Sequence, residues 1–302
     1  MTLRRTTPLL LVALALAGAS ATAASAPPPT DRSIKLDLIE RLQHGPQILI
    51  LGDSRGRQAE PSDLHRLTGL TAFNAAVMGG SAPDAWVFIR YTADRFPTQQ
   101  RRYIWFVSAG LVGNVVDPRT DADPRGRRYL QEVEPYLSRQ PETVEWPKQP
   151  FTGYRPDGGL AGRASSPSPA HVLKVKAEAT AMVAEIERHP PTTATLGPQP
   201  RKLFEHLLAY LNGRGEEPVI VFNPIYPTVY AALQRYRNPV IAGSLRYLRT
   251  LHSSYDFRVV NAEDIRVWGG TSANWKNASH IDRFNMKRLL AYVVRHSGNA
   301  LR

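Results

Sequence analysis

Two short stretches of this sequence hold residues that could together carry out acyl transfer. Ser54 stands near the start of the chain, directly after Asp53, and His280 stands near its end, three residues after Asn277. A serine becomes a nucleophile when a base such as histidine takes its proton, and the histidine in turn needs a partner that fixes its tautomer. These residue types predict a reactive Ser54 with His280 as its base, provided that the fold brings the two stretches together.

The segment that must position Ser54 is an apolar run at 48–51. Gly45-Pro46 and Gly52 bound this run, which predicts a short strand buried on both faces, as in a parallel sheet. Ser54 would then follow the carboxyl end of the strand, where ligands and reacting groups gather in open α/β sheets. Taken alone, Gly52-Asp53-Ser54 is more typical of a plain β-to-α turn, so its significance depends on the rest of the chain.

The remaining chain alternates between strand and helix patterns. Apolar β-forming runs at 71–74, 102–107, 218–222 and 257–261 predict further strands. Helices are expected at 33–43, 62–67, 83–96, 171–187, 201–212, 240–252 and 283–296. This alternation predicts an α/β fold with a doubly wound, three-layer parallel sheet. Residues 117–200 are rich in proline and predict an insertion, loop-like from 117 to 169 and helical after it. On the first helix, Ile34, Leu38 and Leu42 are the expected buried stripe.

The N-terminus predicts export. Arg4-Arg5 precedes an apolar run at 9–16 and small residues through Ala26, which is the pattern of a secretory signal peptide over 1–26, cleaved after Ala23 or Ala26. An uncleaved amphipathic tether is the alternative. We therefore expect a single α/β domain over 27–302 in the periplasm or outside the cell. No other segment is long and apolar enough to predict a membrane span.

Composition limits the chemistry and the partners. The chain has no cysteine, which excludes disulfides, thiolate catalysis and cysteine zinc sites. His44, His65 and His206 are isolated and form no i, i+4 pair, so no metal site is expected. The net charge of +12 favours anionic envelope polymers or membrane surfaces as partners, with a general effect on solubility as the alternative. No aromatic-interleaved basic patch indicates nucleic-acid binding, and no oligomeric state follows from the sequence.

Three blocks of the sequence together resemble the SGNH (GDSL-like) hydrolase superfamily. These are Gly52-Asp53-Ser54, Gly79 five residues after Asn74, and His280 ahead of the last helix. The GDSR form, Asn223-Pro224, the signal peptide and the long mid-chain insertion, which contains Tyr154-Arg155-Pro156-Asp157-Gly158, are similar to bacterial envelope proteins. Those proteins are related to polysaccharide O-acyltransferases and D-alanyl-transfer proteins. The resemblance spans roughly residues 46–296. It implies a flavodoxin-like fold, Ser54 as nucleophile, His280 as general base, and the N–H groups of Ser54 and Gly79 as an oxyanion hole.

The sequence departs from the family pattern at two places. The family's Gly-x-Asn block after the third strand is replaced, because Leu111-Val112 follows Gly110, so Asn114 is the loose candidate for the third oxyanion donor. The family's aspartate three residues before the histidine is Asn277 here. An amide can orient the imidazole but supplies no charge to stabilise the imidazolium. The site is then a dyad, a triad with Asp282 or Asp264 as its acid, or a site that has lost hydrolysis.

Two functions from different classes follow. The first is an exported serine esterase or O-acyltransferase, without a cofactor, that acts on acylated envelope polysaccharide or a related small ester. The second is a catalytically degraded protein of the same fold that binds polysaccharide or an assembly partner. A phosphate- or nucleotide-binding module is disfavoured because neither a P-loop nor a G-x-G-x-x-G motif follows the first strand.

Overall fold

The computed structural model of the protein describes residues 30–108, 115–139, 153–162, 165–191 and 197–302. The predicted signal peptide and Asn114 lie outside these residues. The centre of the fold is a sheet of five parallel strands in the order β2-β1-β3-β6-β7. The strands are β1 (Ile48–Gly52), β2 (Ala72–Asn74), β3 (Arg102–Val107), β6 (Pro218–Phe222) and β7 (Arg258–Asn261). The predicted α/β class and parallel sheet are confirmed.

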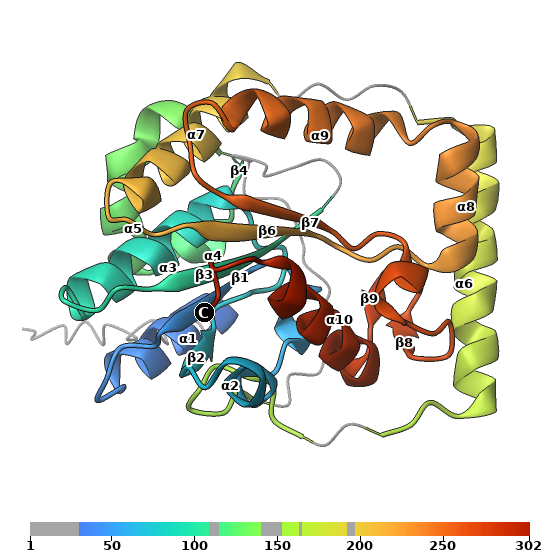
Figure 1. The fold of residues 1–302 in the computed structure, drawn as a ribbon, viewed down its shortest axis with the longest axis horizontal. Helices are drawn as coiled ribbons and strands as arrows, with labels where there is room; N and C mark the ends of the chain where they lie inside the picture. The colour runs from blue at the N-terminus through green and yellow to red at the C-terminus, as the bar shows by residue number, and fades with distance from the viewer. Residues whose placement is uncertain (1–29, 109–114, 140–152, 163–164, 192–196) are drawn as a thin grey trace, which may run out of the picture.

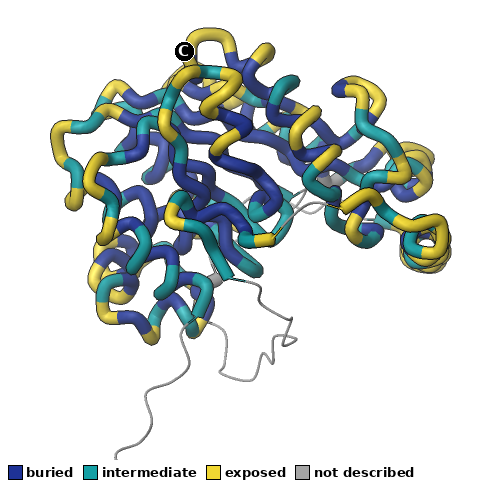
Figure 2. The backbone as a smooth tube through the Cα atoms, turned by 90° about the horizontal axis from the view of Figure 1, so that it is seen from below, coloured by how far each residue is buried: buried dark blue, intermediate teal, exposed yellow. Residues whose placement is uncertain are grey.

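Helices cover both faces of this sheet, which makes three layers (Figure 1). One face packs against α1 (Asp31–Glu40), α3 (Ala82–Arg95), α7 (Pro198–Asn212) and α9 (Pro239–Leu251). The other packs against α2 (Pro61–Thr68), α6 (Pro169–Arg188), α8 (Pro227–Arg235) and α10 (Arg283–His296). Successive strand residues point to opposite faces, so Leu49 and Leu51 join the first core while Ile48 and Ile50 join the second. Buried residues run through the middle of the molecule (Figure 2), and β1, β3 and β6 are almost wholly buried, whereas β7 at the edge of the sheet is largely not.

The prediction for the segment after β3 was wrong, because its prolines begin helices. Residues 118–136, expected to be loop, form α4 (Pro118–Ala122), α5 (Pro124–Leu130) and a 3-10 helix η2 (Gln131–Tyr136). Two-residue strands β4 (Val115–Val116) and β5 (Ser138–Arg139) flank them. Pro118 and Pro124 each occupy the first turn of a helix, where the missing N–H costs nothing, and Asp117 and Asp123 cap these helices. The unpredicted α8 begins in the same way, at Pro227.

The first helix buries a different stripe from the expected one. Arg32, Lys35, Leu36 and Ile39 face inward, whereas Ile34, Leu38 and Leu42 are only partly buried. A pattern of apolar residues cannot reveal this face, because two of its four positions carry charges. Those charges are tolerated in the interior because each meets polar partners there. α6 likewise buries only Val175 and Ala179, since it lies at the edge of the molecule beside α8 (Figure 1).

A small hairpin lies between β7 and the last helix. It consists of β8 (Trp275–Asn277) and β9 (His280–Ile281), which pair antiparallel. Two 3-10 turns, η1 (Gly56–Gln58) and η3 (Ile265–Trp268), lie in the connections after β1 and β7. Within the described residues, no helix combines the length and the apolar character that crossing a membrane requires.

Candidate active site

Ser54 lies just beyond the carboxyl end of β1, next to the carboxyl end of β3. Gly52 ends β1 with a φ of 139°, a backbone conformation that residues with a side chain rarely adopt. A Cβ atom at this position would come within 2.6 Å of the Phe106 carbonyl oxygen on β3. Only glycine therefore allows the chain to leave the sheet here. In a sheet of this strand order, the gap between β1 and β3 is the switch point at which ligands bind.

The hairpin brings His280 onto Ser54. The Ser54 hydroxyl lies 2.7 Å from Nε2 of His280, and Nδ1 of the same ring lies 2.8 Å from Oδ1 of Asn277. The Ser279 N–H donates to Oδ1 at 3.0 Å, which fixes the orientation of the amide. Because Oδ1 can only accept, the imidazole carries its proton on Nδ1 and leaves Nε2 free to accept from the hydroxyl. The three residues predicted from the sequence are thus in contact, in the order serine, histidine, asparagine.

The environment keeps this imidazole neutral. Burial lowers the pKa of His280 to about 4, and the nearby cations Arg55, Lys276 and Arg57 act in the same direction. Asp53 is the group that opposes them. A neutral ring is the form that a general base requires, but a base with so low a pKa removes a hydroxyl proton with little driving force. A carboxylate at the position of Asn277 would correct this, and none is there.

A polar network ties Ser54 to the loops after β3 and in the hairpin. The Ser108 hydroxyl donates to the Asp53 carboxylate at 2.6 Å. The Arg55 guanidinium pairs with Asp53 at 3.4 Å, donates to the Ser108 hydroxyl, and donates to the Ser279 carbonyl at 3.2 Å. Arg55 therefore bridges the serine loop and the histidine loop. The sequence did not reveal this role, although the arginine directly after the serine in Gly-Asp-Ser-Arg is the signal that marks it.

Two of the three predicted oxyanion donors, the N–H groups of Ser54 and Gly79, lie in the described part of the chain. Among the described residues, the N–H groups of Ser54 and Gly79 have no hydrogen-bond acceptor. The loop that holds Gly79 packs directly against the end of β1, because a Cβ atom on Gly80 would lie 2.3 Å from the Gly52 carbonyl oxygen. Val77 N–H also donates to that carbonyl at 3.1 Å. Asn114, the third predicted donor, lies outside the described residues.

Buried polar residues hold the loop that carries Gly79. The Asn74 side chain donates to the carbonyls of Gly56 and Ala59, at 3.1 and 2.7 Å, and so joins β2 to the turn after Ser54. Lys35 of α1 is fully buried and donates to the carbonyls of Asn74 and Ala76, at 2.8 and 2.5 Å. Sequence reasoning missed Lys35, and only its i, i+4 spacing to Ile39 could have placed it on the inner face of the helix.

Neither alternative acid contacts the imidazole. Asp282 caps α10 by accepting the Asn285 N–H at 2.9 Å, and burial raises its pKa. Asp264 caps η3 and pairs with Arg266 at 2.6 Å. The ring nitrogen that an acid would engage is already bonded to Asn277. The structure thus assembles a serine–histidine–asparagine arrangement, and it does not place either aspartate on the ring.

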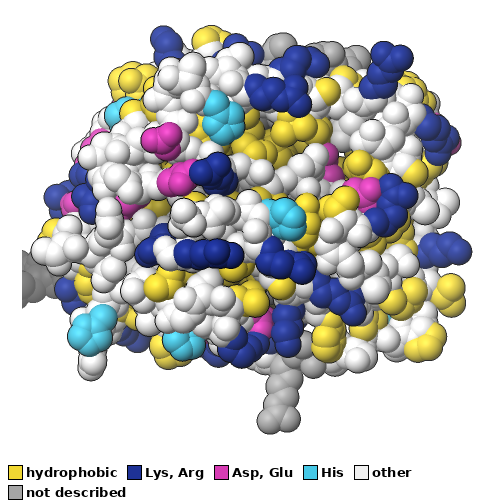
Figure 3. Space-filling model, viewed as in Figure 1, with side chains coloured by type: hydrophobic (Ala, Val, Ile, Leu, Met, Phe, Trp, Pro, Cys, Tyr) yellow, Lys and Arg dark blue, Asp and Glu magenta, His cyan; other side chains and the backbone are white. Residues whose placement is uncertain are grey.

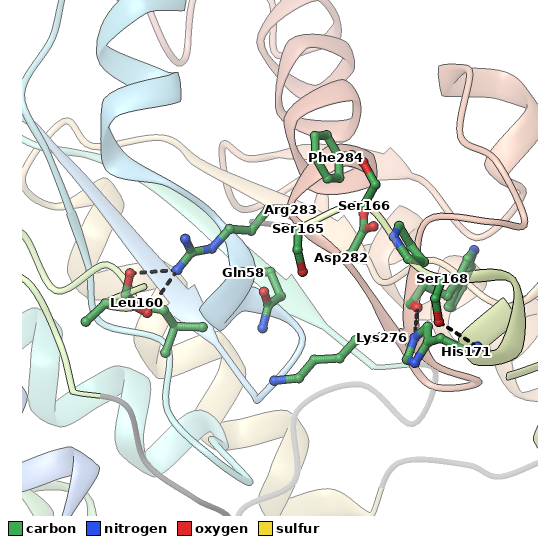
Figure 4. Close-up of a pocket in the computed structure, with 13 residues that line it drawn as sticks. Gln58, Leu160, Ser165, Ser166, Ser168, His171, Lys276, Asp282, Arg283 and Phe284 are labelled. Carbon is green, nitrogen blue, oxygen red and sulfur yellow. Dashed lines mark hydrogen bonds between the residues drawn. The ribbon is translucent and has the colours of Figure 1, made fainter. Parts of the chain in front are cut away.

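A pocket of about 500 Å³ opens beside the serine and histidine loops (Figure 4). Its walls include Gln58 from the turn after Ser54, and Lys276 and Asp282 from either side of His280. His171, at the start of α6, also lines it and is held by the Trp275 carbonyl at 2.9 Å.

No cluster of three metal-ligating side chains occurs in the described part of the chain.

A scan against protein-family models finds no match, and no curated protein matches this chain.

Proposed function

We propose that this protein is a serine esterase or O-acyltransferase of the SGNH type. The observation that carries the proposal is the contact of the Ser54 hydroxyl with Nε2 of His280 at 2.7 Å, together with Asn277 on Nδ1 at 2.8 Å. A hydroxyl, a base with a free ring nitrogen, and a residue that fixes the tautomer are the three groups that activate a serine. The N–H groups of Ser54 and Gly79, which meet no acceptor among the described residues, are the proposed donors to the developing oxyanion.

The reaction would proceed through an acyl-enzyme. Ser54 Oγ attacks the ester carbonyl while its proton moves to Nε2 of His280, and the N–H groups of Ser54 and Gly79 bind the resulting oxyanion. The tetrahedral intermediate then expels the alcohol, which takes the proton from the imidazole. In the second half of the reaction, water or a sugar hydroxyl gives its proton to His280 and attacks the acyl group. When this second tetrahedral intermediate collapses, the acid or the new ester is released, and His280 returns its proton to Ser54 Oγ.

The substrate class and location rest on the sequence. The signal-peptide pattern over 1–26 supports export, and the GDSR form, Asn223-Pro224 and the insertion support a likeness to envelope O-acyltransferases. Acylated polysaccharide of the cell envelope, or a related small ester, is therefore the proposed substrate. The strand order, with Ser54 at the switch point, agrees with the flavodoxin-like arrangement that the resemblance implies.

Labelling with a fluorophosphonate probe tests the proposal directly. We expect the mature protein to be labelled and to hydrolyse a small aryl acetate, and we expect both properties to be lost in Ser54→Ala and in His280→Ala. Ser253→Ala, which removes an exposed hydroxyl at the end of α9, is the matched control and should behave like the wild type. Labelling and turnover that persist in Ser54→Ala would contradict the assignment.

One observation favours the second candidate, a degraded member of the same class that binds polysaccharide or an assembly partner. The orienting position holds the neutral Asn277, and the pKa of His280 is lowered to about 4. A protein without labelling or turnover that still binds acylated polysaccharide would be this second candidate.

A further inference from the structure

Two cations beside the candidate catalytic pair lack an acidic partner. Arg283 and Arg155 share the carboxylate of Glu60, at 2.8 Å in the case of Arg283. By contrast, no carboxylate of the described residues lies within 4.0 Å of Lys276 or Arg57, and the Nε of Arg57 is buried without a hydrogen-bond partner.

Lys276 projects into the pocket beside Ser54 and His280. Its side chain extends across the pocket toward Gln58, while Arg283 turns away to the carbonyl of Leu160 (Figure 4). Lys276 is exposed as a residue, but partial burial of its ammonium group lowers its pKa, and Arg57 and Arg283 act in the same direction, so positive charges crowd this region. Lys and Arg side chains are also prominent in the middle of the face shown in Figure 3.

The other walls of the pocket suit hydroxyl groups. Ser165, Ser166 and Ser168 line it together with Gln58. Asp282 contributes Oδ2, a buried oxygen to which no described residue donates a hydrogen bond, while its other oxygen caps α10. A buried acceptor without a donor is unfavourable, so a ligand hydroxyl that donates to it would be favoured. The pocket thus combines one available ammonium group with an acceptor and several polar groups.

We infer that this pocket binds an anionic sugar residue of the ester substrate, with Lys276 holding its acidic group. The inference rests on the proposed function and names its substrate class. Ser54 and His280 do not themselves line the pocket, but Gln58 in its wall follows Ser54 by four residues, and Lys276 and Asp282 belong to the segment that carries His280. The charge of Lys276 also acts on the His280 imidazole, so the pocket lies near the reacting groups. A sugar whose ester carbonyl lies at Ser54 would place its own acidic group, or that of the next residue, beside Lys276. The acidic group is a carboxylate or a phosphate, and both suit an ammonium ion.

Three matched substrates separate these cases. The methyl glycoside of O-acetylgalactose is neutral. The methyl glycoside of O-acetylgalacturonic acid adds a free carboxylate, and the 6-phosphate of the neutral glycoside adds a phosphate. We expect kcat/KM of the full mature protein to be about tenfold higher for one of the two anionic esters than for the neutral one, as about 1.4 kcal/mol of extra interaction gives. The gain should lie mainly in KM, and it should shrink as the salt concentration rises.

Substitution of Lys276 then tests the assignment. The preference for the anionic ester should vanish in Lys276→Gln and should be largely retained in Lys276→Arg. Lys202→Gln is the matched control, because Lys202 is exposed on α7, which covers the opposite face of the sheet. An anionic preference that survives Lys276→Gln, or no preference while Ser54-dependent turnover continues, would overturn the inference and leave the proposed function standing.

Binding to a Ser54→Ala protein keeps the test independent of turnover. Titration calorimetry with digalacturonate, with its reduced neutral counterpart digalactose, and with galactose 6-phosphate measures the pocket alone. We expect one anionic ligand to bind more tightly than the neutral one, and we expect its Kd to rise about tenfold when Lys276→Gln is added to Ser54→Ala. This result would support the anionic subsite even if no ester is turned over. Equal or undetectable binding of all three ligands refutes the anionic subsite.

Discussion

Replacing Asn277 by aspartate should convert a weak base into a stronger one. The carboxylate would stand where the amide oxygen lies 2.8 Å from Nδ1 of His280. Two charges about 4 Å apart interact by about 1 kcal/mol in water and about 4 kcal/mol at the effective dielectric of a protein surface. Since 1.36 kcal/mol corresponds to one pKa unit, the substitution should raise the pKa of His280 from about 4 to between about 5 and about 7.

The same interaction stabilises the imidazolium that forms in the transition state. The expected gain in kcat for a small aryl acetate, measured well above the new pKa, is therefore between about fivefold and about a thousandfold. For comparison, the reverse change in a serine protease lowers kcat about ten-thousandfold. The assay is the pH profile of kcat/KM between pH 3 and pH 9, which reports the pKa of the base and the plateau rate together.

Asn274→Asp is the control for this experiment. It places a new charge at the residue before β8, in the loop that leads to the histidine, without replacing the group bonded to Nδ1. It should leave the plateau rate within about twofold, because a more distant charge is screened by solvent. If Asn277→Asp changes neither the pKa nor the rate, the charge argument is refuted. If Asp282→Ala then abolishes turnover, Asp282 is the functional acid.

Three further outcomes follow from the geometry. In the wild type, the acid limb of kcat/KM should rise with pH through about 4 and be flat above it, because the neutral ring is the base; a limb near 6.5 would contradict the lowered pKa of His280. Lys35→Met should reduce kcat more than it raises KM. It should also lower the free energy of unfolding in urea by about 1–3 kcal/mol for each carbonyl left without a donor. If kcat and the free energy of unfolding are both unchanged, Lys35 does not support the loop that carries Gly79. Gly80→Ala should lower activity and thermal stability, because its Cβ would lie 2.3 Å from the Gly52 carbonyl oxygen. Gly197→Ala is the control and should be tolerated, because its Cβ meets only an ordinary contact at 3.6 Å. Equal activity and stability of the two variants would refute the close packing of the Gly80 loop against β1.

The sequence alone determined the sheet and the two ends of the candidate site. Strands at 102–107 and 218–222 and the last helix at 283–296 have the predicted bounds, because long apolar runs and strong periodicity are local signals. Ser54 could be proposed because it follows the predicted first strand, and His280 because it precedes the last helix. Asn277 could be proposed because it stands three residues before the histidine, where the family resemblance places an aspartate. The helices at 118–130 were missed, since a proline that begins a helix looks in sequence like a proline that ends one.

Only the tertiary structure decided which groups meet. Ser54 and His280 are 226 positions apart, and nothing local to either one specifies a 2.7 Å contact. The choice of Asn277 over Asp282 depends on the turn of a short hairpin, which sets which oxygen reaches Nδ1. The buried charge of Lys35 is likewise invisible in sequence, because its stability comes from carbonyl groups about forty residues away along the chain. A sequence pattern reports which local element a residue belongs to, whereas the packing of distant elements decides which residues come into contact.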